Sequence, residues 1–215
     1  MRRPWHGAMP IMLTLPVGLH RRPLRRQRRL RRLAVAALIA LGVALLAAGF
    51  WLPAKAEVAQ HLLNRAWQRT TVGDAAAKPW PWADTHPVVR LTLPGSDEPL
   101  TVLAGASGRN LAFAPTLLDG SAAPGSDGVT VIAGHRDTHF RSLASLALGD
   151  ELTLERPDGS VLTYEVADLD VVDSTRAELR LDADESIVVL VTCWPFEAVT
   201  VGGSWRYVVT ARQRF

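Results

Sequence analysis

The sequence predicts a mainly β protein: a closed or nearly closed barrel of about seven or eight strands, with an N-terminal transmembrane helix and short helices in the connections. Two observations predict the barrel. Residues 84–215 hold about seven short strand-like runs with little helix, and no long crossover of the kind that joins parallel strands separates them. A third observation, 20 uncharged residues from Leu33 to Leu52, predicts the helix.

Residues 1–32 contain ten arginines and no acidic residue. This predicts a cytoplasmic N-terminus, because positive charge flanks the cytoplasmic end of a span. At about 1.5 Å of rise per residue, residues 33–52 reach roughly 30 Å, the thickness of a bilayer core. Trp51 lies at the far end, where interfacial aromatic residues are placed. A cleaved signal peptide ending near Ala47–Gly49 is the alternative, but its apolar region is usually shorter. We expect a retained anchor.

The charge of the exported part differs from that of the whole chain. Residues 53–215 carry 14 basic and 21 acidic side chains, a formal charge of −7. An acidic domain does not favour nucleic acid as a partner. The basic N-terminal segment is explained by membrane topology and anionic lipid. The single cysteine, Cys193, excludes an internal disulfide and leaves one thiol that could be reactive.

Residues 53–83 join the predicted span to the predicted barrel. Apolar residues at helical spacing predict an amphipathic helix over 54–69, whose apolar face could pack on the domain or on the membrane surface. Residues 70–82 have the composition of a linker. Trp80 and Trp82 are costly to leave in water, so we expect both to dock on the domain. They could form a lid over a cleft, or simply pack on the outside of the fold.

The strand signals of residues 84–215 follow one another with turn residues between them. The expected strands cover 88–93, 100–103, 129–133, 151–155, 161–172, 187–192 and 205–211. The connection over 110–127 is expected to hold one short helix around 111–118, and 140–148 to form a helical turn. Residues 156–159, Arg-Pro-Asp-Gly, indicate a hairpin.

Three polar sites fall at the ends of strongly apolar strands. They are Cys193 after 187–192, His135 after 129–133, and Arg206 at the start of 205–211. Pro195 should end the first of these strands, because proline cannot donate to a ladder. Cys193 at a strand end is either a nucleophile held by rigid backbone or a small buried hydrophobic residue.

Cysteine and histidine together can form a thiolate–imidazolium pair, in which the sulfur is nucleophilic and the imidazolium can protonate a leaving group. An arginine in the same cleft could donate to a substrate carbonyl or to an oxyanion. This combination indicates acyl transfer. The contact is an assumption, because His135 and Cys193 lie far apart in the sequence.

Two other functions are compatible with these residues. His135, Asp137 and His139 would share one face of a strand and, with Cys193, could ligate zinc in a metal-dependent hydrolase. Alternatively, Asp137 and His139 hold the loop that positions His135. The third possibility is a non-catalytic, membrane-tethered binding module. Thr192 is expected to line the cleft and could help an oxyanion, whereas two rivals for the arginine role, Arg212 and Arg214, are expected to be solvated.

Several of these segments resemble the sortase family. The resemblance is carried by Val189-Leu190-Val191-Thr192-Cys193, by Ala133-Gly134-His135-Arg136-Asp137-Thr138-His139-Phe140, and by Arg206 on the following strand. Sortases are membrane-anchored cysteine transpeptidases with an eight-stranded β-barrel. The resemblance implies that Cys193 is the nucleophile, His135 the general acid, and Arg206 the stabiliser of the substrate carbonyl and oxyanion. The first threonine of the family's Thr-Leu-x-Thr-Cys strand is replaced by Val189.

Residues 134–140 and 202–209 look most like those of the proteobacterial sortases of class GN. That subgroup implies an inner-membrane protein with its catalytic domain on the periplasmic side. Its expected substrate is a protein with a C-terminal Leu-Pro-x-Thr-Gly-like sorting signal, cleaved between Thr and Gly, and the acyl group would pass to an amine acceptor. No residue pattern calls for a cofactor or a metal in this interpretation.

Overall fold

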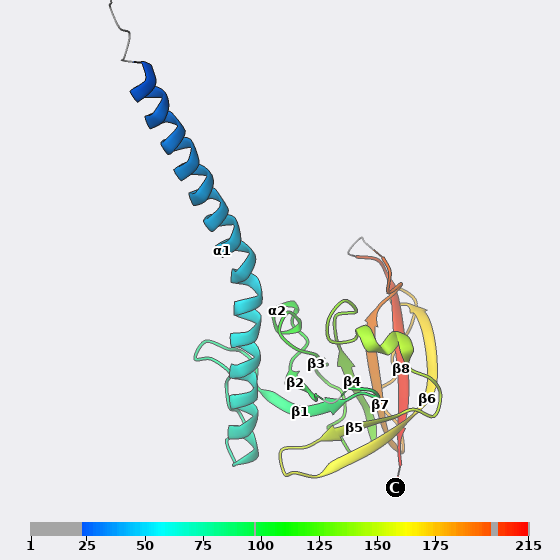
Figure 1. Ribbon diagram of the computed structural model, residues 1–215. Helices are drawn as coiled ribbons and strands as arrows, with labels where there is room; N and C mark the ends of the chain where they lie inside the picture. The colour runs from blue at the N-terminus through cyan, green and yellow to red at the C-terminus, as the bar shows by residue number, and fades with distance from the viewer. Residues whose placement is uncertain (1–22, 97, 199–201, 215) are drawn as a thin grey trace, which may run out of the picture. The chain divides into compact units, whose positions relative to one another are not determined.

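The computed structural model describes residues 23–96, 98–198 and 202–214. The chain divides into two compact units between residues 52 and 53. Its helices are α1 (Pro23–Thr71), α2 (Gly108–Leu111) and the 3₁₀ helix η1 (Arg141–Ser145). Its strands, labelled in Figure 1, are β1 (Pro87–Thr92), β2 (Leu100–Ala104), β3 (Thr116–Leu117), β4 (Gly128–Ala133), β5 (Glu151–Glu155), β6 (Val161–Asp173), β7 (Ser186–Cys193) and β8 (Trp205–Gln213).

The N-terminal unit, as far as it is described, is the first part of α1. This helix contains an apolar window of mean hydropathy 2.6, none of it buried, and within the described residues it is the one helix long and apolar enough to cross a membrane. Large apolar side chains such as Leu38, Phe50 and Trp51 are exposed along it. Outward-facing apolar side chains suit a lipid environment, so α1 is a candidate membrane span.

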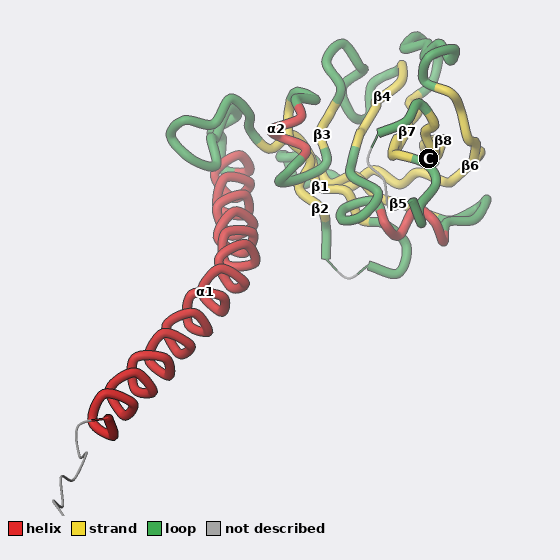
Figure 2. Tube along the Cα trace, turned by 90° about the horizontal axis from the view of Figure 1, so that it is seen from above, coloured by secondary structure: helices red, strands yellow, loops and turns green. Residues whose placement is uncertain are grey.

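The second unit contains a closed barrel with the strand order β1-β2-β3-β4-β7-β8-β6-β5, and Figure 2 shows its strands from above. The prediction of a mainly β, closed barrel is confirmed. The expectation that no parallel crossover occurs is wrong, because β4 pairs with β7 in parallel, from Gly128 opposite Ser186 to Ala133 opposite Val191. The β5–β6 hairpin lies within the long connection, and this hid the crossover in the sequence.

The helix expected around residues 111–118 is also wrong. Helix α2 lies earlier, because Ser107 caps it by accepting a hydrogen bond from the Asn110 amide. Pro115 disfavours helical backbone in the residue before it, and its carbonyl accepts instead from the Leu103 amide. The chain then forms β3, which pairs in parallel with β2 and antiparallel with β4. This short strand is the one that the sequence pattern missed.

The remaining strand predictions agree with the structure to within a few residues. Strand β7 ends at Cys193, two residues before Pro195, as expected. The helical turn expected over 140–148 is η1. Strand β6 pairs with β5 from Val161 opposite Glu155, which forms the predicted hairpin.

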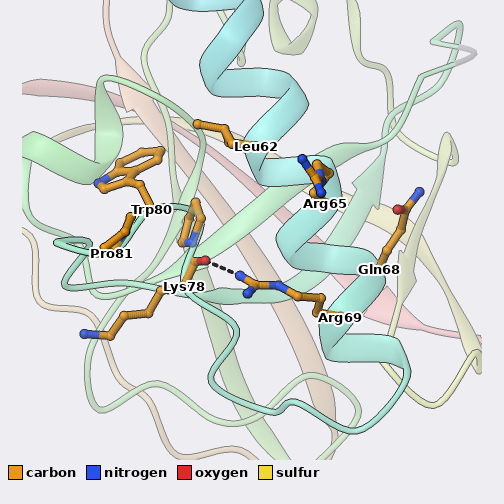
Figure 3. A pocket seen from close by; sticks show the side chains of 8 residues that line it. Leu62, Arg65, Gln68, Arg69, Lys78, Trp80 and Pro81 are labelled. Atoms are coloured by element: carbon orange, nitrogen blue, oxygen red, sulfur yellow. Dashed lines mark hydrogen bonds between the residues drawn. The ribbon is translucent and has the colours of Figure 1, made fainter.

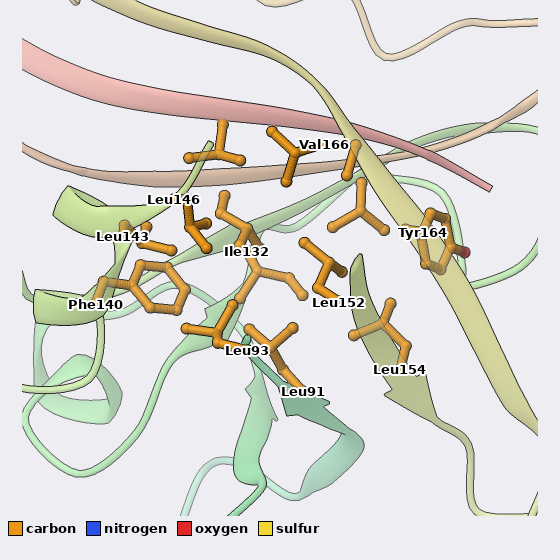
Figure 4. Close-up of a cluster of buried hydrophobic side chains, with 14 of the residues drawn as sticks. Leu91, Leu93, Ile132, Phe140, Leu143, Leu146, Leu152, Leu154, Tyr164 and Val166 are labelled. Carbon is orange, nitrogen blue, oxygen red and sulfur yellow. The ribbon is translucent and has the colours of Figure 1, made fainter. Parts of the chain in front are cut away.

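The barrel interior is filled by one large apolar cluster, which includes Leu91, Ile132, Leu152, Leu154, Tyr164, Val166, Val188, Leu190 and Val209. Phe140, Leu143 and Leu146 belong to the same cluster, and Figure 4 shows them packed beside Ile132 and Leu93. These residues lie in the segment that follows β4, a few positions after His135. The core therefore anchors the segment that carries His135.

The second part of α1 belongs to the barrel unit. Leu63, Ala66 and Trp67 are buried, and Leu63 packs with Leu103 and Ala114 in a second apolar cluster. The Arg90 guanidinium lies 5.4 Å from the centre of the Trp67 ring. The amphipathic helix predicted over 54–69 thus packs its apolar face on the domain, which was one of the two expectations for it.

The two linker tryptophans behave differently. Trp80 packs edge-on against Phe113, with 5.0 Å between ring centres, and helps line a cleft beside α1 in which Arg69 donates to the Lys78 carbonyl (Figure 3). Trp82 is 79% exposed. The prediction that both tryptophans dock on the domain is confirmed for Trp80 and wrong for Trp82. The contact of Trp80 with Phe113 is packing on the outside of the fold.

Candidate active site

The pairing of β7 with β8 places Cys193 directly opposite Arg206. Side chains of directly opposed residues in an antiparallel pair lie on the same face of the sheet and close to one another. Both residues are partly exposed. A thiol and a guanidinium from two strands are thus presented together at the end of β7.

The pairing of β4 with β7 brings His135 to the same end of the barrel. The Gly134 amide donates to the Val191 carbonyl at 3.1 Å, and the Thr192 hydroxyl donates to the Gly134 carbonyl at 2.7 Å. Strands β4 and β7 run in the same direction, so His135 leaves β4 where Cys193 ends β7. Thr192 is buried, and its hydroxyl ties the two strand ends together.

The turn after β4 is tight. The Phe140 amide donates to the His135 carbonyl at 3.0 Å. The Phe140 ring packs so closely over Gly134 that a Cβ there would lie 2.7 Å from it. His135 is exposed at the start of this turn. Glycine at 134 therefore permits the packing that fixes where His135 leaves the barrel.

The Arg206 guanidinium is held by the backbone of the loop between β7 and β8. Its Nη1 donates to the Gly203 carbonyl at 2.7 Å and to the Trp205 carbonyl at 2.9 Å. These two bonds anchor the Arg206 side chain at the start of β8, in the pair of strands that carries Cys193.

His139 and Asp137 occupy different surroundings. Burial lowers the pKa of His139, and the charge of His135 lowers it further, whereas a hydrogen bond with the Phe113 backbone raises it. Asp137 is largely exposed and accepts from Arg136 Nε at 3.3 Å. Within the described part of the chain, no three His, Cys, Asp or Glu side chains are grouped as metal ligands. The zinc site weighed for His135, Asp137, His139 and Cys193 is therefore not assembled.

Sequence reasoning missed the role of Arg136. Its side chain is only 6% exposed. Nη1 donates to the Pro195 carbonyl at 2.8 Å and Nη2 to the Ala198 carbonyl at 2.7 Å. No local pattern could have revealed this, because the partners are backbone carbonyls 59 and 62 residues away.

An aromatic cluster beside Cys193 was also missed. The Trp194 and Tyr207 rings stack with 5.8 Å between centres, and Phe196 meets both edge-on. Burial raises the pKa of the Tyr207 hydroxyl. Aromatic residues directly after the strand were visible in the sequence, but only the register of β7 with β8 shows that Tyr207 joins them.

Comparison with known proteins decides the family. The sequence model described as "Sortase domain" matches residues 91–214, more than half of the chain. This chain belongs to the sortase family. The match begins near the end of β1, covers β2 to β8, and includes Cys193, His135 and Arg206.

A curated relative of this sortase is Sortase D of Bacillus subtilis (strain 168), 29% identical over 124 residues. The match covers 57% of this chain and 62% of that protein, so the chain spans less than two thirds of the relative's length. Among solved structures, sortase C-1 from Actinomyces oris is 29% identical with a TM-score of 0.53, covering 60% of this chain and 74% of the other.

Two further structures share the fold. Sortase A from Corynebacterium diphtheriae is 25% identical with a TM-score of 0.55, over 73% of this chain and 84% of the other. A Clostridium perfringens Sortase D5 transpeptidase has a TM-score of 0.60 and covers 74% of this chain and 99% of its own, but at 21% identity it supports the fold alone.

Proposed function

We propose that this sortase is a cysteine transpeptidase in which Cys193 is the nucleophile, His135 the general acid and Arg206 the stabiliser of the substrate carbonyl. The observation that carries the proposal is the register of three strands. Cys193 lies opposite Arg206, and parallel pairing of β4 with β7 delivers His135 to the same barrel end. Family membership gives this arrangement its chemical interpretation.

The reaction has two acyl-transfer steps. The Cys193 sulfur attacks the carbonyl carbon of the scissile peptide bond, and Arg206 donates hydrogen bonds to the oxyanion that forms. The C–N bond breaks as His135 protonates the departing amine, which leaves a thioester. An incoming amine attacks the thioester, an amide forms, and the thiol is released. Water in place of the amine would give hydrolysis by the same steps.

Three further residues support these groups in the proposal. Thr192 fixes the end of β7 against Gly134 through its hydroxyl. His139 lies near enough to His135 for their charges to interact. Asp137 pairs with Arg136 within the same turn. None of the three needs to touch the substrate to act.

The substrate in this proposal is a protein with a C-terminal Leu-Pro-x-Thr-Gly-like signal, cleaved between Thr and Gly. Residues 1–32 would lie in the cytoplasm and 33–52 would cross the inner membrane in contact with its lipid. Residues 53–83 would lead to a catalytic domain over 84–215 on the periplasmic side. The exposed apolar surface of α1 supports the anchor, and the class GN assignment remains a prediction from sequence.

Intact-mass analysis tests this proposal. The full chain in detergent is incubated with a peptide containing Leu-Pro-x-Thr-Gly, beside Cys193→Ala, His135→Ala and the control His61→Ala, which changes an exposed histidine of α1. We expect a mass gain equal to the acyl fragment in the wild type and in the control. It should be absent with Cys193→Ala and greatly slowed with His135→Ala.

Other outcomes contradict separate parts of the proposal. Ready alkylation of Cys193 by iodoacetamide without an adduct would keep the nucleophile but reject this signal. If Cys193 is not alkylated and no adduct forms, the enzyme is rejected and the binding-module alternative is favoured. An adduct that also forms in Cys193→Ala would reject Cys193 as the nucleophile.

A further inference from the structure

Arg136 connects two segments that meet at the candidate active site. It follows His135 directly, and its two Nη atoms donate to the carbonyls of Pro195 and Ala198 at 2.8 and 2.7 Å. Those carbonyls belong to the segment after Cys193 at the end of β7. One side chain thus joins the backbone next to the candidate acid to the backbone just beyond the candidate nucleophile.

The burial of Arg136 shows that this connection is built into the fold. A charged side chain that is 6% exposed is costly unless it is hydrogen-bonded. Asp137 accepts from Nε at 3.3 Å, but its carboxylate is 66% exposed, so solvent screens that pair. The two main-chain carbonyls therefore contribute to the compensation for this buried charge. Charge-assisted bonds of this kind are stronger than neutral ones.

The strand ladder reaches Cys193, which pairs with Arg206, but it does not reach His135, which lies beyond the end of β4. The bond from Thr192 to Gly134 fixes the strand ends, and His135 and the residues after Cys193 lie beyond it. Arg136 provides two bonds across this gap. A planar guanidinium holds two acceptors in a fixed relation, which the single ammonium of lysine cannot do.

We propose that Arg136 is a positioning residue that locks the turn after His135 to the segment 194–198 and so sets the separation of His135 and Cys193. This inference rests on the proposed function, because it assumes that the two residues react with one substrate. Misplacement of a catalytic group by about 1 Å can cost about 100-fold in rate. Arg136 acts through the backbone and has no contact with the substrate in this role.

Acylation kinetics test the proposal in the full chain in detergent. Arg136→Met and Arg136→Lys are compared with Arg156→Met, which removes an arginine whose Nε donates to Ser160 in the β5–β6 hairpin. All rates are measured well below the melting temperature of each variant. With Arg136→Met we expect thioester formation to slow about 100-fold and KM to change much less. Arg136→Lys should recover part of the rate, and Arg156→Met should match the wild type.

A substrate-free measurement keeps this test separate from that of the proposed function. Amide hydrogen exchange should accelerate in residues 135–140 and 194–198 in Arg136→Met and remain unchanged in Arg156→Met. If Arg136→Met does not fold, Arg136→Lys serves for both comparisons. A wild-type acylation rate in the variant, even with a lower melting temperature, would overturn the positioning role. Unchanged amide hydrogen exchange in both segments of Arg136→Met would also overturn the positioning role. This outcome does not depend on whether the wild type accepts the peptide.

Discussion

At the scale of single residues, Gly134 tolerates little change, because the Phe140 ring occupies the space where a side chain would begin. In Gly134→Ala the ring must move, and it belongs to the barrel core. We expect a loss of about 1–3 kcal/mol in the free energy of unfolding and slower thioester formation, measured by urea unfolding and intact mass. Gly108→Ala is the control, since a Cβ there meets open space. Equal stability of the two variants would contradict this interpretation.

His139 should make stability depend on pH. Its pKa is lowered in the folded chain, chiefly by burial, so below about pH 6.5, the usual histidine value, the unfolded chain binds the proton more readily. Neutral His139 therefore contributes to the free energy of unfolding above that pH, and this contribution is lost as the pH falls. We therefore expect the melting temperature to drop between pH 7.5 and 5.5, and to drop less in His139→Gln. His61→Gln is the control and should show the same drop as the wild type. If His139→Gln also shows the full drop in melting temperature, His139 is not the source of the pH dependence.

At the scale of elements, the second part of α1 is part of the domain. Leu63 is fully buried against Leu103 and Ala114. Leu63→Ala should therefore cost about 2–5 kcal/mol in the free energy of unfolding, measured with denaturant. Val58→Ala on the same helix should cost far less, because Val58 is 60% exposed. Equal losses would mean that the helix does not pack on the barrel in solution.

What the sequence could predict about the elements follows from how local each signal is. Strand β7 and the ends at Cys193 and Ala133 were predictable, since apolar runs and proline act locally. Strand β3 was not, because two residues carry no periodicity and its pairing depends on β2 and β4. Arg136 was overlooked for the same reason: a buried arginine bonded to distant carbonyls leaves no mark on its neighbours in the chain.

At the scale of the whole molecule, residues 1–52 and 53–215 should have separable roles. We expect the full chain to remain with membranes in high salt and alkaline carbonate, because α1 carries a long exposed apolar surface. A chain that begins at Pro53 should leave the membrane fraction yet form the thioester at a similar rate. The intact mass of the membrane form gives the control, since cleavage near Ala47–Gly49 would show a signal peptide in place of an anchor.

The parallel pairing of β4 with β7 also bears on the order in which the protein folds. The Gly134–Thr192 bond joins residues 58 positions apart. Contacts between distant residues form slowly, because the chain loses entropy in closing the long loop before the contact can stabilise it. During synthesis β4 must wait for β5, β6 and β7 to emerge, and Arg206 arrives later still. Cys193, His135 and Arg206, the three residues of the proposed active site, therefore come together only when nearly the whole chain is available. A partly synthesised chain is thus expected to be inert towards other proteins' peptide bonds.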